Sequence, residues 1–269
     1  EGRQEIWEDP TTLVSASIVP KVTFRENGGD VVVSGRFGFA SGCDHAPWLS
    51  VGGLLPGDQP SPVICALPAD DVIIDHKSWD VIGLRGTGSK DLVIAEEVVV
   101  PRHRVLRVAE SASRKSPGQV HYGGPLYTCP WRTTAILVLA APVIGAAKAA
   151  VRRFQERLDD HFLVALANTQ RNDPAAGYRL AESTAEIHAA ELLLYDAAAR
   201  LDQLGGADEV DLLINASIVR DCGWAVRALA EAVDRLYEAS GANAMRADEP
   251  MQRLWRDVNA ARSHAILTW

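Results

Sequence analysis

Short hydrophobic runs, most of which alternate apolar and polar residues, occupy the chain from residue 16 to residue 106. Such runs are typical of half-buried β-strands. They lie at residues 17–26, 31–35, 48–52, 63–67, 71–76 and 92–100. The segment Asn27-Gly28 separates the first two runs and predicts a hairpin, because positive φ is required in such a turn. Leu92 and Ile94 are expected to share one face of the last strand. The pattern predicts a small antiparallel β-sandwich or barrel over residues 16–106.

After Pro130 the spacing of the hydrophobic residues becomes helical. Residues 133–160 begin with a segment that is apolar on all sides, which predicts a helix in the centre of a bundle, kinked at Pro142. A repeat at heptad spacing predicts a second helix over residues 180–204. The repeat consists of Ile187, Leu194 and Leu201.

Two more helices are expected toward the end of the chain. Asp208 is predicted to cap a third helix that ends near Ala239. Pro250 is predicted to lie in the first turn of a fourth helix, which runs to Trp269. Four helices with short connections predict an antiparallel bundle over residues 131–269.

The remaining segments complete the predicted domain organisation. Residues 107–130 are rich in Ser, Gly and Pro and are predicted to form a linker loop. Residues 1–15 contain the break Asp9-Pro10 and start with Glu1 rather than Met, so they are interpreted as the end of a preceding piece. The predicted fold class is α+β, with a β-domain followed by a helical bundle.

Composition and charge narrow the function classes. The chain has 27 basic and 35 acidic residues, a formal net charge of −8, which argues against a nucleic-acid partner. The four cysteines are scattered without a CxxC pair, so neither a metal site nor a disulfide framework is predicted, and a cytoplasmic location fits. The most apolar run, residues 135–150, is shorter than a membrane span, so no membrane association is expected.

Residues 31–53 hold the densest set of candidate site residues. Glycines interrupt the strand after its three valines, and glycine within a strand marks a bulge or a close approach of the backbone. Ser41 offers a hydroxyl, Gly42 an unshielded amide and Phe39 a flat apolar face. This set suits a planar ligand with a polar edge. A tight hairpin corner explains the same residues without a ligand.

Residues 79–101 and the final helix supply further candidates. The first segment is a glycine-rich turn followed by a strand, and its spacing excludes a nucleotide P-loop. A solvated hairpin and a nest of amides facing an anion both remain open. On the final helix, Asp257 and His264 are seven residues apart and are expected on one face. His264 is either an interior or capping residue or an acid or base at neutral pH. Arg256 and Asp257 are predicted to form an ion pair.

Four segments in this order, FASGCDHAPW, WDVIGLRGTGSKDLVIAEEVVVP, APVIGAAKAA and LWRDVNAARSHA, resemble the acyl-CoA dehydrogenase superfamily. Within it they are most similar to the oxygenase components of two-component flavin-dependent monooxygenases, which hydroxylate aromatic compounds. The resemblance covers nearly the whole chain. It implies an acyl-CoA dehydrogenase-like fold, usually a homotetramer, whose N-terminal helical domain is represented here only by its tail at residues 1–15.

The resemblance also implies the chemistry. A separate flavin reductase supplies reduced FMN or FAD, which reacts with O₂ to a C4a-hydroperoxyflavin that oxygenates an aromatic or other electron-rich small molecule. Ser41 is implied to lie at the N5–C4a edge of the flavin. His264 is implied to lie close to the same ring, where it stabilises the hydroperoxide or takes the proton of a phenol. The implied cofactor-binding residues are Phe39, Ser41, Gly42, Arg85, Gly86, Thr87 and Arg132.

One departure from the superfamily pattern separates two of its branches. The common acyl-CoA dehydrogenases carry a catalytic Glu shortly after the Arg-Asp pair of the last helix, where this chain has Ala265. Alanine cannot abstract a proton, which favours a monooxygenase over an acyl-CoA dehydrogenase-like flavoprotein. Some dehydrogenases place this Glu on an earlier helix, where Glu182, Glu186 and Glu191 are available. A non-catalytic scaffold that retains the fold is the third alternative.

Overall fold

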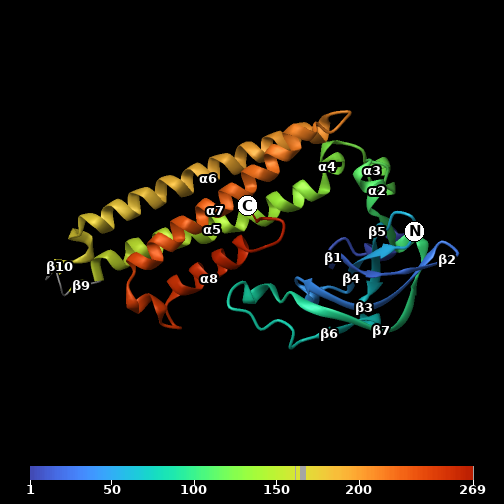
Figure 1. The fold of residues 1–269 in the computed structure, drawn as a ribbon, viewed down its shortest axis with the longest axis horizontal. Helices are drawn as coiled ribbons and strands as arrows, with labels where there is room; N and C mark the ends of the chain where they lie inside the picture. The colour runs from blue at the N-terminus through green and yellow to red at the C-terminus, as the bar shows by residue number, and fades with distance from the viewer. Residues whose placement is uncertain (161, 164–167, 269) are drawn as a thin grey trace. The chain divides into compact units, whose positions relative to one another are not determined.

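The computed structural model describes residues 1–160, 162–163 and 168–268 (Figure 1). The chain divides into two compact units. The first comprises Glu1–Val81 and Arg85–Tyr122, and the second comprises Ile82–Leu84 and Gly123–Trp269. The first unit contains two four-stranded sheets and the second is mainly helical, so the predicted α+β class is confirmed.

The first unit consists mainly of two four-stranded sheets, with strand orders β1-β4-β5-β8 and β2-β3-β7-β6. A short helix, α1 (Gly2–Ile6), precedes them. The strands are β1 (Val14–Thr23), β2 (Arg25–Asn27), β3 (Asp30–Ala40), β4 (Trp48–Leu55), β5 (Ser61–Pro68), β6 (Ile73–Asp75), β7 (Lys90–Val100) and β8 (Val105–Arg107).

The pairing of the strands confirms one expectation and corrects another. β2 and β3 form the predicted hairpin, in which Asn27 pairs with Asp30 and Gly28 has a φ of 61°. β1 pairs with β4 in parallel, although an antiparallel arrangement was expected throughout. A parallel pair needs a crossover connection, and here the chain passes through β2 and β3 of the other sheet between the two strands.

The hydrophobic core of the first unit is formed by both sheets. Leu92 and Ile94 of β7 are buried and Ala95 is exposed, as the alternation predicts. Val31 and Val33 of β3 are buried completely in the same core, together with Leu49 of β4. The stretch that precedes the candidate site is therefore anchored in the core.

The predicted loop over residues 107–130 contains three short helices instead: α2 (Val108–Ala112), α3 (Pro117–Tyr122) and α4 (Pro125–Thr128). Two of them begin with a proline, which is suited to the first helical position because its missing N–H needs no partner there. α4 is fixed to the bundle, since the Thr128 hydroxyl donates to the carbonyl of Gly205.

The four predicted helices are present as α5 (Trp131–Asp160), α6 (Pro174–Gly206), α7 (Leu212–Ala239) and α8 (Pro250–Arg262) (Figure 1). The heptad positions Ile187, Leu194 and Leu201 are buried in their core, as predicted. Two short strands, β9 (Phe162–Leu163) and β10 (Asn168–Thr169), lie between α5 and α6.

Each of the last two helices differs from the sequence expectation at one end, α7 at its start and α8 at its end. Asp211, not Asp208, caps α7, because its carboxylate accepts hydrogen bonds from the backbone N–H groups of Leu213 and Ile214 at 2.8 and 3.0 Å. α8 starts at Pro250 as predicted but ends at Arg262, well before the expected end at Trp269.

The described residues of this chain bury only one face of α5, which was expected in the centre of the bundle because its first half is apolar on all sides. Ile136, Ala140 and Val143 pack in the core, whereas Val138 and Leu139 are exposed. By length and composition alone, Trp131–Leu158 is long enough to cross a membrane, which the shorter apolar run did not indicate. A core helix of a bundle passes the same test, and α5 packs on α6, α7 and α8.

Candidate functional site

The end of β3 presents an aromatic side chain from a strained backbone. Phe39 has a φ of 66°, a left-handed conformation that costs a residue with a Cβ about 1–3 kcal/mol and that clusters at functional sites. Its side chain is 65% exposed and meets the ring of Trp79 edge-on, with 6.0 Å between ring centroids. The Phe39 ring is thus largely accessible to a planar ligand.

Two buried serines of β1 fix the backbone on either side of Phe39. The Ser17 hydroxyl donates to the Gly38 carbonyl at 2.5 Å, and the Ser15 hydroxyl donates to the Ser41 carbonyl at 2.8 Å. These bonds connect the two sheets at the site. The sequence analysis missed both residues, although polar side chains on the buried face of a strand are a signal of such bonds.

The glycine-rich turn of residues 85–89 joins the end of β3. The Gly42 N–H donates to the Thr87 carbonyl at 2.9 Å, so the predicted unshielded amide is already used. The Ser41 and Ser89 hydroxyl oxygens are 2.7 Å apart, and the Ser89 and Thr87 hydroxyl oxygens are also 2.7 Å apart. Two segments that are more than forty residues apart in sequence therefore form one polar surface.

Six predicted cofactor-binding residues meet on this surface of the first unit: Phe39, Ser41, Gly42, Arg85, Gly86 and Thr87. The last three form the short 3-10 helix η3 (Arg85–Thr87), in which Arg85 and Gly86 are exposed. We call residues 39–42 and 85–89 together the cradle.

A charged cluster fixes the cradle from the side. Lys90 donates to the Asp44 carboxylate at 2.5 Å, and its Nζ is 3.0 Å from Nδ1 of His76. The hydrogen bond from Lys90 holds the pKa of the Asp44 carboxyl below its usual value. Asp44 also lies against Gly88, so the cluster anchors both segments of the cradle. His76 was not singled out from the sequence.

The cradle fits a planar ring with a polar edge. The indole Nε1 of Trp79 is buried, and the described residues offer it no hydrogen-bond partner. A buried donor without an acceptor costs about 1–3 kcal/mol, which is recovered if a ligand supplies the acceptor. Gly42 has a φ of 73° and open space where a Cβ would lie, so a ring can approach the backbone there. These features suit an isoalloxazine ring.

The other two predicted site residues lie in the second unit. Arg132 is exposed in the first turn of α5. His264 follows the end of α8 and occupies a turn, so the prediction that it shares a helical face with Asp257 is wrong. Desolvation lowers the pKa of His264 below its ordinary 6.5. Its imidazole is therefore neutral at pH 7, and its closeness to Ser41 stays a prediction.

The predicted ion pair between Arg256 and Asp257 does not form. Consecutive helical residues point in different directions, and each of these two side chains binds the Ile82–Leu84 segment instead. Arg256 donates to the Ile82 carbonyl and to Oε1 of Gln252. A Cβ on Gly83 would lie 2.2 Å from the Arg256 carbonyl oxygen, so only glycine permits this close approach to α8.

The carboxylates considered as alternative bases are engaged in ion pairs of the bundle. Arg235 lies 3.0 Å from Glu182 and 2.8 Å from Glu186. Glu191 lies 2.5 Å from Nζ of Lys148. Each of these carboxylates is thus paired with a basic side chain of the bundle.

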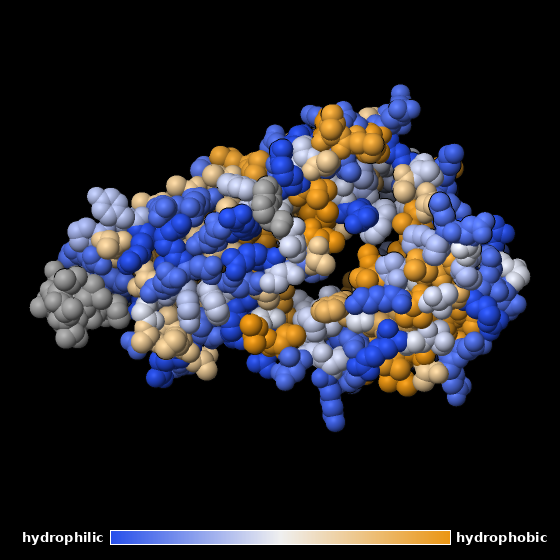
Figure 2. All heavy atoms as spheres, viewed as in Figure 1, coloured by the Kyte–Doolittle hydropathy of each residue, from blue (hydrophilic) through white to orange (hydrophobic). Residues whose placement is uncertain are grey.

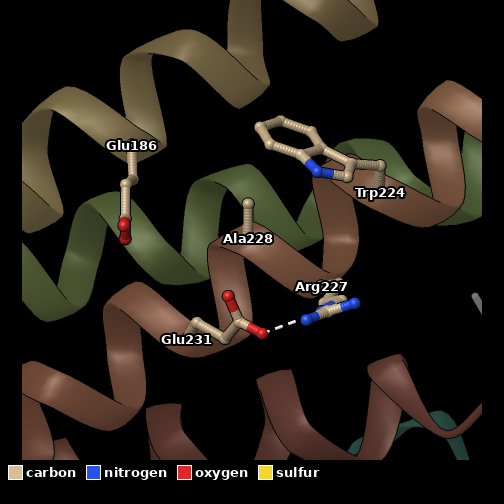
Figure 3. Close-up of a pocket in the computed structure, with 5 residues that line it drawn as sticks. All are labelled: Glu186, Trp224, Arg227, Ala228 and Glu231. Carbon is tan, nitrogen blue, oxygen red and sulfur yellow. Dashed lines mark hydrogen bonds and ion pairs between the residues drawn. The ribbon is translucent and has the colours of Figure 1, made fainter.

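A hollow of about 220 Å³ lies between α6 and α7 (Figure 3). Glu186 reaches it from α6, and Trp224, Arg227, Ala228 and Glu231 line it from α7 (Figure 3). Arg227 and Glu231 pair with each other at 2.8 Å, so their charges are compensated within the hollow. None of the residues predicted to bind the cofactor lines it.

Comparison with known proteins agrees with this fold. The profile of the family described as "Acyl-CoA dehydrogenase, C-terminal domain" matches residues 137–269. The crystal structure of 3-HSA hydroxylase from Rhodococcus sp. RHA1 is similar with a TM-score of 0.90 and 33% identity, covering 99% of this chain and 68% of that one. The fold is therefore that of the acyl-CoA dehydrogenase superfamily.

Two relatives show to which branch of the superfamily the chain belongs. The flavin-dependent monooxygenase oxygenase subunit HsaA of Mycobacterium tuberculosis is 35% identical, covering 98% of this chain and 68% of the relative. The FADH(2)-dependent resorcinol hydroxylase, oxygenase component, of Rhizobium sp. is 32% identical, covering 100% and 69%. The chain belongs to the family of oxygenase components of flavin-dependent monooxygenases, which are oxidoreductases.

Proposed function

We propose that the cradle binds reduced flavin and that the protein transfers one oxygen atom of O₂ to the ring of a phenol. The observation that carries the proposal is the convergence of residues 39–42 and 85–89 on one surface, joined by the bond from Gly42 to Thr87. Reduced FAD is favoured over FMN, because the resorcinol hydroxylase relative is named as FADH(2)-dependent. The same name supports hydroxylation of an aromatic substrate, since resorcinol is a phenol.

The residues of the chain contribute position and proton control. Bound reduced flavin supplies the electrons that activate O₂ for oxygen transfer. Phe39 would contact the bound ring and exclude water, which limits unproductive release of peroxide. The Ser41 hydroxyl would hold a hydrogen bond at the N5 edge of the ring. The Trp79 indole N–H, which has no partner among the described residues, would donate to an acceptor atom of the ring or the substrate.

His264 is proposed as the group that receives the phenolic proton. Its lowered pKa leaves the imidazole neutral near pH 7, the form that accepts a proton. Removing this proton increases the electron density of the aromatic ring and favours attack on the activated oxygen. Arg132 is proposed to bind a phosphate of the flavin from the start of α5.

Acyl-CoA dehydrogenation is not supported by the observed carboxylates. Ala265 replaces the usual base, and Glu182, Glu186 and Glu191 are paired with cations. The discriminating assay offers butyryl-CoA with an artificial electron acceptor. Reduction of that acceptor would favour an acyl-CoA dehydrogenase-like function.

We also propose a homotetramer in the cytoplasm that receives flavin from a separate reductase. The exposed apolar residues of α5, including Val138 and Leu139, support self-association. Hydrophobic side chains also lie on the surface at the start of α7, where Leu212 and Leu213 are exposed (Figure 2). The relatives' names, oxygenase subunit and oxygenase component, support a separate reductase. Light scattering coupled to size-exclusion chromatography measures the oligomeric state directly.

The function is tested with chemically reduced FAD and ¹⁸O₂. The protein is mixed with reduced FAD without oxygen, then with ¹⁸O₂ and phenol, resorcinol or catechol, and products are analysed by mass spectrometry. Incorporation of one ¹⁸O atom into the ring of at least one phenol is expected. Binding of reduced FAD followed only by hydrogen peroxide release would reject the proposed substrate class. A protein that binds neither oxidised nor reduced FAD would support the non-catalytic scaffold.

A further inference from the structure

Three hydroxyl groups form a row behind the outward surface of the cradle. Ser41 is exposed, Ser89 is only 5% exposed, and Thr87 is half-buried. The Ser89 oxygen is 2.7 Å from both of its neighbours. Ser89 is therefore the inner member through which Ser41 and Thr87 are connected.

The proton count of the row permits two arrangements. Each hydroxyl has one proton to donate and two lone pairs that accept. If Ser89 donates to Ser41, the proton of Ser41 is free to be donated outward. If Ser89 donates to Thr87, it accepts the proton of Ser41, and Ser41 offers a lone pair outward. The direction of the row thus decides whether Ser41 acts as a donor or an acceptor toward a ligand.

We infer that Ser89 is a positioning residue that lets the Ser41 hydroxyl change from hydrogen-bond donor to acceptor when the flavin changes from oxidised to reduced. The inference rests on the proposed function, which places the flavin N5 edge at Ser41. Oxidised flavin has an unprotonated N5 that accepts a hydrogen bond, whereas reduced flavin has an N5–H that donates one. A fixed donor at this position would suit only the oxidised form.

The loss of Ser89 has unequal consequences for the two forms. With oxidised flavin, Ser41 donates to N5. Replacing Ser89 then leaves only a lone pair of the Ser41 oxygen without a donor, which costs little. With reduced flavin, Ser41 accepts from N5–H, and its own proton then has no acceptor in Ser89. A donor that the bound ring shields from water and that has no acceptor is the expensive case. Replacement of Ser89 therefore weakens the binding of reduced flavin selectively.

The test compares dissociation constants for oxidised and anaerobically reduced FAD in Ser89→Ala and wild type. In Ser89→Ala, the ratio of the dissociation constant for reduced FAD to that for oxidised FAD is expected to rise by about fivefold or more, which is the effect of one lost hydrogen bond. Ser89→Thr restores a hydroxyl and is expected to restore the ratio. Measuring affinities keeps the test independent of turnover.

Ser15→Ala is the matched control. Ser15 is also 5% exposed and also binds Ser41, but through the backbone carbonyl rather than the hydroxyl. Its loss is expected to weaken both forms equally and to leave the ratio unchanged. If Ser89→Ala does not fold, Thr87→Val interrupts the row at its other end and is expected to change the ratio in the same direction.

The outcomes separate the inference from the function on which it rests. An unchanged ratio in Ser89→Ala, or an equal change in Ser15→Ala, overturns the hydroxyl row while the flavin site stands. An unchanged ratio in Thr87→Val likewise overturns the hydroxyl row. A wild-type protein that binds neither form of FAD overturns the flavin site and the row together.

Discussion

The carboxylate of Asp257 accepts a 2.7 Å hydrogen bond from the backbone N–H of Leu84, although 173 residues separate them in sequence. Leu84 has a left-handed φ of 55°, a conformation that needs support in a residue with a side chain. The bond provides this support and fixes the Ile82–Leu84 segment to α8. Asp257 thus has a structural role that its place in the final helix did not reveal.

Replacing Asp257 is expected to destabilise the protein. Asp257→Ala leaves the Leu84 N–H without its acceptor, which costs about 1–3 kcal/mol, whereas Asp257→Asn keeps an oxygen acceptor and costs less. Urea denaturation monitored by circular dichroism measures the difference. Asp248→Ala is the control, since Asp248 is an exposed carboxylate whose ion pair is with Arg246. Equal midpoints for Asp257→Ala and the control would contradict the assigned role.

Two glycines three residues apart are expected to differ sharply on substitution. A Cβ at Gly83 would lie 2.2 Å from the Arg256 carbonyl oxygen, whereas a Cβ at Gly86 would meet no atom within 4 Å. Gly83→Ala is therefore expected to cost about 1–3 kcal/mol through overpacking. Gly86→Ala is expected to leave the thermal midpoint nearly unchanged. Similar midpoints for the two variants would show that α8 does not hold Gly83 this closely.

Ser41→Ala is expected to separate flavin binding from coupling. The backbone of Ser41 stays fixed by Ser15, so the cradle keeps its shape and retains flavin. The lost hydroxyl no longer holds a hydrogen bond at the N5 edge, and a larger fraction of O₂ is released as hydrogen peroxide. Peroxide and product are quantified per flavin oxidised. Unchanged coupling would remove Ser41 from the chemistry.

His264→Ala is expected to lower the yield of hydroxylated product, because no imidazole remains to receive the phenolic proton. His264→Gln is the companion variant, since it keeps a polar side chain that cannot take up a proton at this pH. The product yield is measured at pH 7.5 with saturating reduced FAD. Full hydroxylation by both variants would exclude a role for the imidazole.

The pH dependence follows from the sign of the His264 shift. Desolvation favours the neutral imidazole and lowers the pKa below 6.5, so His264 stays neutral on acidification until that lower pKa is reached. Product formation is expected to persist at pH 6.5 and to fall at lower pH, as the imidazole becomes protonated. NMR titration of the His264 Cε1–H resonance, assigned with His264→Gln, measures the pKa. A pKa of His264 at or above 6.5 would contradict the expected downward shift.

The pattern of the sequence was sufficient for most of the fold. Alternation in β7 and the heptad positions of α6 reflect burial directly, so both elements were predicted correctly. The parallel pairing of β1 with β4 depends on contacts between distant segments, which local pattern does not encode. The short helices α2 to α4 were missed because proline and glycine mark helix starts as well as loops.

The sequence pointed to the candidate-site residues that belong to a motif. It did not point to the residues that only hold those motif residues in place. Phe39, Ser41 and Thr87 stood out through glycine spacing and resemblance. Ser15 and Ser89 are ordinary serines whose importance comes from their buried contacts with Ser41. The turn at His264 was missed because the helical pattern continues past the point where α8 ends.

The attachment of Ile82–Leu84 to α8 has a consequence for the exchange of parts between related enzymes. Because this tripeptide folds with the helices while its neighbours on both sides fold with the sheets, no single crossover divides the gene at the boundary of the units. A chimera joined near residue 123 would pair the tripeptide of one parent with the α8 of another. Such hybrids need to carry the tripeptide and the final helix from the same source.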